Sequence, residues 1–225
     1  MKLGEDNVGQ KGYFMTFEGT DGAGKSTQLK AAQEVLEALG YQTLTLREPG
    51  GTPLGEAIRK LVLDPAYTDT AAETELMLMC AARAQLVQTV IQPALEKGVA
   101  VICDRFADST IAYQGYGRGL DLQAVQQVLQ VATAGIEPDR TILLDADPEQ
   151  IVSRRKAEQD RIEAETLTFQ TSVREGFRAI AEQEPERIRV LDANRNVDDL
   201  QAEIANIIKE DLEDEIDLRD RTRRG

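Results

Sequence analysis

A glycine-rich segment near the amino terminus carries the clearest chemistry in the sequence. It reads Gly, four residues, then Gly-Lys-Ser, and its members are Gly19, Thr20, Asp21, Gly22, Ala23, Gly24, Lys25, Ser26 and Thr27. Glycines let backbone N–H groups approach a phosphate chain, a lysine can reach the outer phosphates, and a serine hydroxyl can bind Mg²⁺. The segment follows an apolar run and opens a helical pattern, which is the context that a phosphate-binding loop requires. We therefore expect it to bind a nucleoside triphosphate.

Two further segments place charged residues directly after predicted strands. Asp104 and Arg105 follow the apolar run 99–103, and the turn-rich segment 47–52 follows a second, alternating run. Ligands of open parallel sheets gather outside the carboxyl ends of the strands, so both segments belong at the same edge as the phosphate loop. We expect Asp104 to hold magnesium together with Ser26, and Arg105 to grip a phosphate. The alternative is an ordinary surface Asp–Arg pair that ends a strand.

The composition excludes several other kinds of chemistry. The 225 residues include 40 acids and 26 bases, for a net charge of −14, and no histidine. Binders of nucleic acid or anionic membranes normally carry a basic face, so we expect neither partner, and any phosphate site must be a local cluster of cations. Histidine bases, triads and zinc sites are excluded. Cys80 and Cys103 lie in apolar runs and are expected to be buried and free.

Apolar runs and helical patterns alternate along the chain, which predicts a doubly wound α/β domain with a parallel sheet. The expected strands are residues 13–18, 42–47, 99–103, 141–145 and 188–192. The expected helices are residues 25–39, 53–63, 70–97, 122–134, 148–156, 166–184 and 197–211. We expect a kink or break in the long helix near Pro93.

The domain organisation predicted from this pattern is simple. Residues 13–210 form a single domain, preceded by a loose leader (1–12) and followed by a charged tail (211–225). No segment is long and apolar enough to cross a membrane, and the amino terminus is polar, so we expect a cytoplasmic enzyme. The wide apolar surface of the long helix 70–97 suggests a homodimer, with a plain core helix as the alternative.

Taken together, the phosphate loop, the segment Arg47–Thr52 and the run Asp104–Gln114 resemble thymidylate kinases, which move a phosphoryl group from ATP to dTMP. The resemblance spans about Tyr13 to Ile207, and the segment 81–85 also matches. It implies a P-loop NTPase fold of the nucleoside monophosphate kinase type. That fold has a five-stranded doubly wound parallel sheet flanked by helices and a small lid, here near residues 153–165. The resemblance also implies ATP and Mg²⁺ as donor and cofactor, dTMP as acceptor, and a homodimer.

The resemblance assigns roles on the acceptor side. Asp21 would accept a hydrogen bond from the sugar 3′-hydroxyl, and Arg59 and Arg105 would hold the acceptor phosphate. Arg83 would reach a thymine carbonyl, with Thr110 near the base edge. The full set of expected substrate-binding residues is Asp21, Glu48, Pro49, Arg59, Met79, Arg83, Arg105, Ser109, Thr110 and Tyr113. Within that set, the Tyr113 ring would crowd the 2′ position and so favour deoxyribose.

The resemblance also directs the search for a catalytic cation to the lid. Some family members have Arg in the phosphate loop where this chain has Gly22, so the chain is similar to the bacterial kind, whose lid supplies the cation. Arg161 is our first choice and Arg154 the second, with Arg155 third. The predicted catalytic set is Lys25, Arg105, Arg161 and Arg154.

Three positions depart from the family pattern. Met79 stands where many members have a Phe that stacks on thymine, Ser172 stands where Arg is common, and the lid lacks a Gly before Asp160. Two other functions are weighed against the first. One is a different nucleotide or deoxynucleoside kinase, and the other is a P-loop switch or binding module, although the Asn-Lys-x-Asp motif of GTP-type sites is absent.

Overall fold

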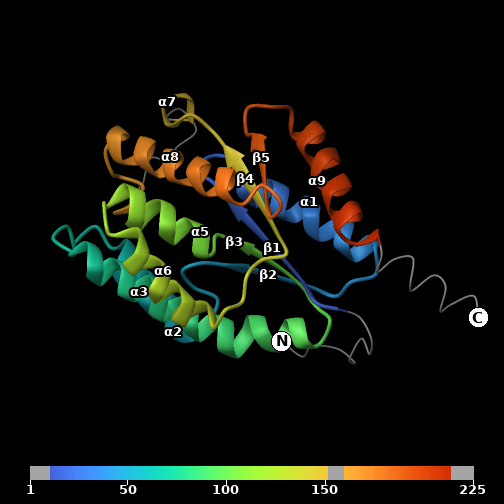
Figure 1. The fold of residues 1–225 in the computed structure, drawn as a ribbon, viewed down its shortest axis with the longest axis horizontal. Helices are drawn as coiled ribbons and strands as arrows, with labels where there is room; N and C mark the ends of the chain where they lie inside the picture. Colours follow the sequence, from blue (N-terminus) through green and yellow to red (C-terminus); the bar gives the residue numbers. More distant parts are fainter. Residues whose placement is uncertain (1–10, 152–159, 214–225) are drawn as a thin grey trace, which may run out of the picture.

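A five-stranded parallel sheet forms the centre of the computed structural model, which describes residues 11–151 and 160–213. The strands follow the order β2-β3-β1-β4-β5, as Figure 1 shows. They are β1 (Tyr13–Glu18), β2 (Thr43–Arg47), β3 (Ala100–Asp104), β4 (Arg140–Asp145) and β5 (Ile188–Asp192). Because all pairings are parallel, the loops after these strands meet at one edge. The predicted α/β fold is confirmed.

Helical segments connect the strands and cover both faces of the sheet (Figure 1). They are α1 (Lys25–Ala38), α2 (Pro53–Leu63), α3 (Ala72–Leu86), the π-helical turn η1 (Val87–Ile91), α4 (Gln92–Glu96), α5 (Ala107–Thr110), the π-helical turn η2 (Ile111–Gly117), α6 (Leu122–Thr133), α7 (Pro148–Ile151), α8 (Leu167–Gln183) and α9 (Val197–Asp211). None of these helices is long and apolar enough to span a bilayer, within the ranges that the structure describes.

Side-chain alternation along β1 explains why both faces are covered. Met15 and Phe17 are fully buried in a core with residues of α1 and α9. Phe14, on the opposite face, packs with Leu86 and Ile91 from the long helical segment. A strand that is apolar on both sides needs helices on both sides, which is the arrangement typical of parallel sheets.

The largest differences from the predicted elements lie in the long helix and after β3. The helix expected over 70–97 continues past Pro93 without breaking, and its irregular part is the wider turn η1 just before that proline. The helical segments α5 and η2 were not predicted, because the run 104–114 was interpreted only as a binding segment. For helix 148–156, only Pro148–Ile151 falls within the described residues.

Candidate active site

A cavity of about 430 Å³ opens at the carboxyl edge of the sheet. It is lined by six of the predicted loop residues, namely Asp21, Gly22, Gly24, Lys25, Ser26 and Thr27. It is also lined by Asp104 and by every residue predicted to bind substrate: Glu48, Pro49, Arg59, Met79, Arg83, Arg105, Ser109, Thr110 and Tyr113, besides Asp21. Residues that are far apart in the sequence therefore meet in one site, as expected for segments that follow the carboxyl ends of parallel strands.

Two glycines shape the phosphate loop. Gly19 has φ +128°, and a Cβ at this position would lie 2.4 Å from the carbonyl oxygen of Leu144. Gly24 has φ 93° at the amino-terminal cap of α1, so only its lack of a side chain lets the helix begin there without strain. The loop is thus pressed against β4 and directs the amino terminus of α1 into the cavity, where backbone N–H groups favour anions.

Lys25 is buried at the base of this loop. Its ammonium group donates to the carbonyl oxygens of Gly19 and Thr20, at 3.1 Å each, and lies 3.7 Å from Oδ1 of Asp21. Burial and the nearby Arg105 lower the pKa of Lys25, while Asp21 works in the opposite direction. The lysine is therefore held in the loop and aimed along it, within the lining of the cavity.

Asp21 joins the phosphate loop to Arg105. The Arg105 guanidinium donates to Asp21 Oδ1 at 2.7 Å, and the Tyr113 hydroxyl lies 3.5 Å from Oδ2. Burial alone would raise the pKa of Asp21, but Arg105 and Lys25 outweigh it and hold that pKa well below its usual range. The carboxylate is ionised at neutral pH and can accept a hydrogen bond from a ligand hydroxyl.

Glu18 holds the backbone of Arg105 in an unusual conformation. Arg105 has φ 72°, in the left-handed region that costs a residue with a Cβ about 1–2 kcal/mol. The buried Glu18 carboxylate accepts from the Phe106 N–H at 2.7 Å and from the Ser109 hydroxyl at 2.5 Å, while Arg105 donates to Ser109 Oγ at 3.1 Å. Burial, together with nearby Asp108, raises the pKa of Glu18 to about 7. Sequence reasoning missed this residue, because an acidic end to β1 looks like any loop boundary.

Arg83 is buried and almost fully hydrogen-bonded. Its Nε donates to Glu48 at 2.7 Å, its Nη1 to the Thr110 hydroxyl at 2.8 Å and its Nη2 to the Phe106 carbonyl at 2.9 Å. These contacts fix the guanidinium in one plane at the cavity wall. Nη1 carries two N–H groups, and the contacts within the described residues use one of them. The other is available to a ligand carbonyl.

The carboxylate of Asp104 has the features of a magnesium ligand. Its Oδ1 is buried and has no hydrogen-bond partner among the residues that the structure describes. Asp104 pairs in register with Phe17 of β1, and both Asp104 and Ser26 line the cavity. Mg²⁺ typically uses one or two protein oxygens and takes its other ligands from phosphates and water. The residues Asp104 and Ser26 therefore fit a magnesium ion.

Electrostatically, the cavity differs from the cationic pocket that we expected. Its lining contains the bases Lys25, Arg47, Arg59, Arg83 and Arg105 and the acids Asp21, Glu48, Asp104, Asp160 and Glu163. The cations cluster as predicted, but acidic residues accompany them. Several lining residues received no role in the sequence analysis, namely Leu63, Gln114, Asp160, Ile162, Glu163 and Gln170. Gln114 lies inside the run Asp104–Gln114, and Asp160, Ile162 and Glu163 lie inside the predicted lid, whereas Leu63 and Gln170 belong to no recognised motif.

Arg161 does not line this cavity, although the sequence analysis ranked it first among the lid arginines. Its guanidinium donates to Glu75 at 2.6 Å and to the carbonyl oxygen of Val62 at 2.9 Å, and its side chain is only 8% exposed. This placement does not support a direct contact with reacting phosphates. Arg154 and Arg155 lie outside the described residues.

The phosphate loop on a five-stranded parallel sheet, with arginines from other segments lining the same cavity, defines a P-loop phosphotransferase of the nucleoside monophosphate kinase type. The family model for thymidylate kinase matches residues 17–204. The chain is 48% identical over 202 residues to a thymidylate kinase from Deinococcus radiodurans, covering 89% of this chain and 98% of that protein. It is 44% identical over 200 residues to one from Symbiobacterium thermophilum, covering 88% and 94%.

A solved structure agrees with these matches. The crystal structure of thymidylate kinase from Ehrlichia chaffeensis superimposes with a TM-score of 0.72 at 33% identity, covering 88% of this chain and 99% of that one. The chain belongs to the thymidylate kinase family, and the resemblance inferred from its motifs is confirmed.

Proposed function

We propose that the protein transfers the γ-phosphoryl group of ATP to the phosphate of dTMP, giving ADP and dTDP. The observation that supports this most directly is the shared cavity. It brings the phosphate loop, with its residues Asp21 and Lys25, against Arg105, while the fixed Arg83 forms another part of its wall. A donor site and an acceptor site thus lie close enough for in-line transfer.

On the donor side, the loop N–H groups and Lys25 hold the phosphates of ATP. Lys25 exchanges its contacts with loop carbonyls for phosphate oxygens, which are stronger acceptors because they are charged. Ser26 and Asp104 hold Mg²⁺, which when bound neutralises charge on the transferring group. The Asp104 oxygen that lacks a partner among the described residues is the best-placed protein ligand.

On the acceptor side, each part of dTMP has a matching group. Arg105 and Arg59 hold the phosphate, and Asp21 accepts from the 3′-hydroxyl. The remaining Nη1 N–H of Arg83 donates to a thymine carbonyl. Tyr113, buried against the site, restricts the space at the 2′ position. The acceptor oxygen is already anionic, so the reaction needs charge stabilisation more than a base.

A lid cation completes the proposed mechanism. Arg161 is committed to Glu75 in the structure, so we propose Arg154 as the first lid arginine to test, with Arg161 as the comparison. Loss of a cation that stabilises the transferring phosphoryl group lowers kcat by about 10³- to 10⁵-fold. Replacement of Arg154 by Ala should therefore reduce kcat far more than it raises the KM for dTMP.

The proposed function is tested by an acceptor panel with ATP and Mg²⁺: dTMP, dUMP, UMP, dCMP, AMP and thymidine. We expect the highest kcat/KM for dTMP and lower values for UMP, because its 2′-hydroxyl meets Tyr113. The comparison with dUMP tests base selectivity, because Met79 stands where many members of the family have a ring that stacks on the base. A thioether contact replaces that stacking in this chain. A better acceptor than dTMP in this panel would overturn the assignment, and transfer to thymidine would point to a nucleoside kinase.

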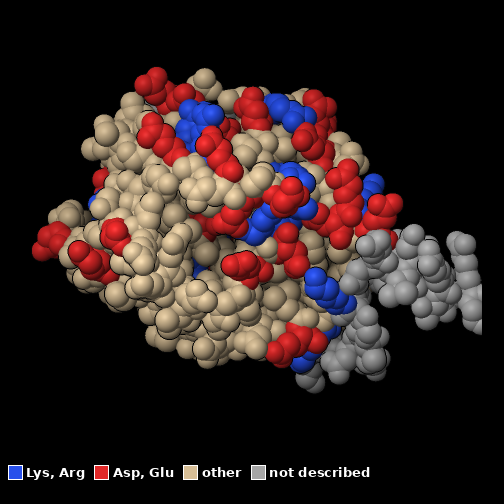
Figure 2. Space-filling model, in the orientation of Figure 1, with Lys and Arg blue, Asp and Glu red and all other residues tan. Residues whose placement is uncertain are grey.

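We also propose that the protein is a homodimer that uses the face formed by α2, α3 and α6. Large apolar side chains on this face are exposed, including Leu61 at 49%, Met77 at 54% and Val131 at 77%. Figure 2 shows few charged side chains over the lower left, where Figure 1 places these three helices. Sedimentation velocity should give a dimer at micromolar concentrations, and a monomer at all concentrations would contradict this proposal.

A further inference from the structure

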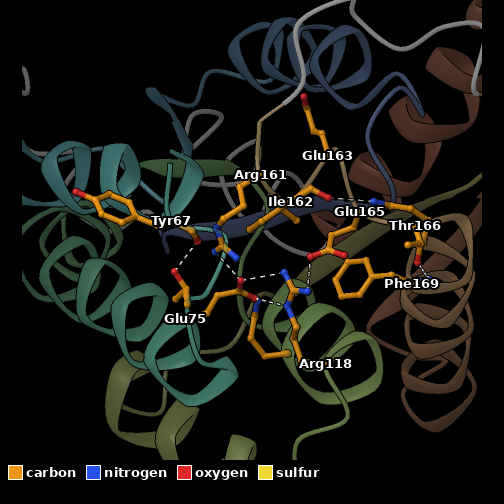
Figure 3. Close-up of polar contacts among 12 residues, drawn as sticks. Tyr67, Glu75, Arg118, Arg161, Ile162, Glu163, Glu165, Thr166 and Phe169 are labelled. Carbon is orange, nitrogen blue, oxygen red and sulfur yellow. Dashed lines mark hydrogen bonds and ion pairs between the residues drawn. The ribbon is translucent and has the colours of Figure 1, made fainter. Parts of the chain in front are cut away.

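A buried carboxylate outside the cavity joins three separate segments of the chain. Glu75, in the first turn of α3, is 1% exposed and lies at the centre of the contacts in Figure 3. Its Oε1 accepts from Gln114 at 2.9 Å and from Arg118 Nε at 3.1 Å. Its Oε2 accepts from Arg118 Nη2 at 3.1 Å and from Arg161 Nη2 at 2.6 Å. One side chain thus connects α3, η2 and the loop 160–165.

Arg161 connects this carboxylate to a fourth segment. Its Nε donates to the Val62 carbonyl at 2.9 Å, and its backbone N–H donates to the Leu63 carbonyl at 3.2 Å, so it also holds the end of α2. In the same loop, Glu165 forms an ion pair with Arg118. The loop 160–165 is therefore fixed at two points, and both lead to Glu75 directly or through Arg118 (Figure 3).

The charges within this cluster balance. Two arginines face two glutamates, and the guanidinium of Arg118 also lies 4.5 Å from the centre of the Phe169 ring. Burial alone would raise the pKa of Glu75, but hydrogen bonds from Arg118 and Gln114 outweigh it and lower that pKa. A buried carboxylate that stays charged binds its partners firmly, because each partner lost would leave charge uncompensated.

The segments that this cluster holds contribute residues to the lining of the cavity. Gln114, Leu63, Asp160, Ile162 and Glu163 all contribute to the lining, whereas Glu75 and Arg161 do not. Asp160 Oδ1 accepts from the N–H groups of Ile162 and Glu163, at 2.9 Å each, so the loop keeps one shape between its anchor points. A change at Glu75 therefore reaches the cavity through the loop and through η2.

We propose that Glu75 is a positioning residue for the acceptor side of the cavity, and that Arg161 is its tether to the loop 160–165. This inference rests on the proposed function for the identity of the acceptor. Neither residue contacts the substrate. The pair sets the position of the groups that do, and Arg161 serves binding geometry, not charge stabilisation of the transferred phosphoryl group.

The test compares Glu75→Gln and Arg161→Ala with the wild type, using steady-state kinetics in which dTMP and ATP are varied separately. We expect either variant to raise the KM for dTMP by about 10- to 100-fold, the size of effect that follows displacement of positioning groups by about 1 Å. The KM for ATP should stay within about twofold, because the cluster holds no residue of the phosphate loop. The double variant should raise the KM for dTMP by less than the product of the two single effects, since both changes break the shared contact between Glu75 and Arg161.

Controls separate this role from a merely structural one. Glu73→Gln changes an exposed glutamate on the same helix and should leave both KM values unchanged. Arg161→Lys keeps a cation opposite Glu75 and should restore most of the dTMP affinity lost in Arg161→Ala. Should Glu75→Gln fold poorly in thermal unfolding, the two Arg161 variants carry the test, because they leave Glu75 paired with Arg118 and Gln114.

Two outcomes would overturn the inference. The first is a fall in kcat of about 10³-fold or more in Arg161→Ala with Glu75→Gln unaffected, which would make Arg161 the catalytic cation. The second is a lower unfolding temperature with unchanged kinetics in both variants, which would make the cluster a stabilising element only. Inactivity of the wild type toward dTMP would instead refute the proposed function, so the two failures are distinguishable.

Discussion

Glu18 should make the stability of this protein depend on pH in a range where few other groups titrate. The chain has no histidine, and burial raises the pKa of Glu18 from 4.5 to about 7. Because the folded-state pKa is higher than the unfolded one, the folded protein binds the proton more tightly. The resulting stability is fully present below pH 4.5 and is lost as the pH rises through 7.

The size of the effect follows from the same shift. One pKa unit corresponds to about 1.36 kcal/mol, so the full contribution of Glu18 is roughly 3 kcal/mol. The acidic chain has a pI near 4.6 and is best handled above pH 5.5. Between pH 5.5 and pH 8, the linkage relation gives a loss of about 2 kcal/mol in the free energy of unfolding from Glu18 alone.

The measurement is urea unfolding of the wild type and of Glu18→Gln at several pH values from 5.5 to 8. Glutamine can accept from the Phe106 N–H and donate to Ser109 Oγ, so it preserves the contacts without titrating. We expect the difference between the two proteins to change by about 2 kcal/mol over this range in favour of the variant at high pH. Glu34→Gln, an exposed position on α1, is the control. A difference that stays constant within about 0.5 kcal/mol would refute the reasoning.

Three further predictions concern the phosphate loop and its neighbours. Lys25→Ala should lower kcat by at least about 10²-fold, with circular dichroism unchanged, because a buried cation at the phosphates is lost; an active variant would contradict its role. Asp104→Asn should raise the Mg²⁺ concentration for half-maximal rate about tenfold or more, seen in a magnesium titration at fixed ATP; an unchanged titration would place the metal elsewhere. Gly19→Ala should lower the unfolding temperature, because its Cβ would lie 2.4 Å from the Leu144 carbonyl oxygen; equal unfolding curves would contradict this.

Much of the site was predictable because its residues occur at strand ends in recognisable runs. The phosphate loop needs glycines at fixed spacing, and Asp104 and Arg105 follow an apolar strand, so local sequence was enough to place them. Because Gly22 stands where some members of the family have Arg, local sequence also predicted that the lid supplies the catalytic cation. What local sequence cannot contain is a partner from a distant segment. Arg161 lies in a charged run typical of a mobile surface, but its position depends on Glu75, 86 residues earlier.

The same limit explains why acidic side chains accompany the predicted cluster of cations in the cavity lining. Within the lining, Arg83 is held by Glu48 and Arg105 by Asp21, so each of these guanidinium groups has a carboxylate from another segment. The need to bind phosphates predicts a cluster of cations, but the sequence does not show which acidic residues fold next to them. In the structure, those carboxylates orient the arginines.

Such pairing suits an enzyme whose chain carries a net charge of −14. An unpaired buried arginine would be costly to desolvate, whereas a paired one can be buried, oriented and left with selected N–H groups for the substrate. Arg83 shows the principle, since three contacts fix its plane and one Nη1 N–H remains for a ligand. It follows that Glu48→Gln should impair base recognition without touching the base. The kcat/KM for dTMP divided by that for dCMP should fall toward one in this variant. An unchanged ratio would show that Arg83 is oriented without Glu48.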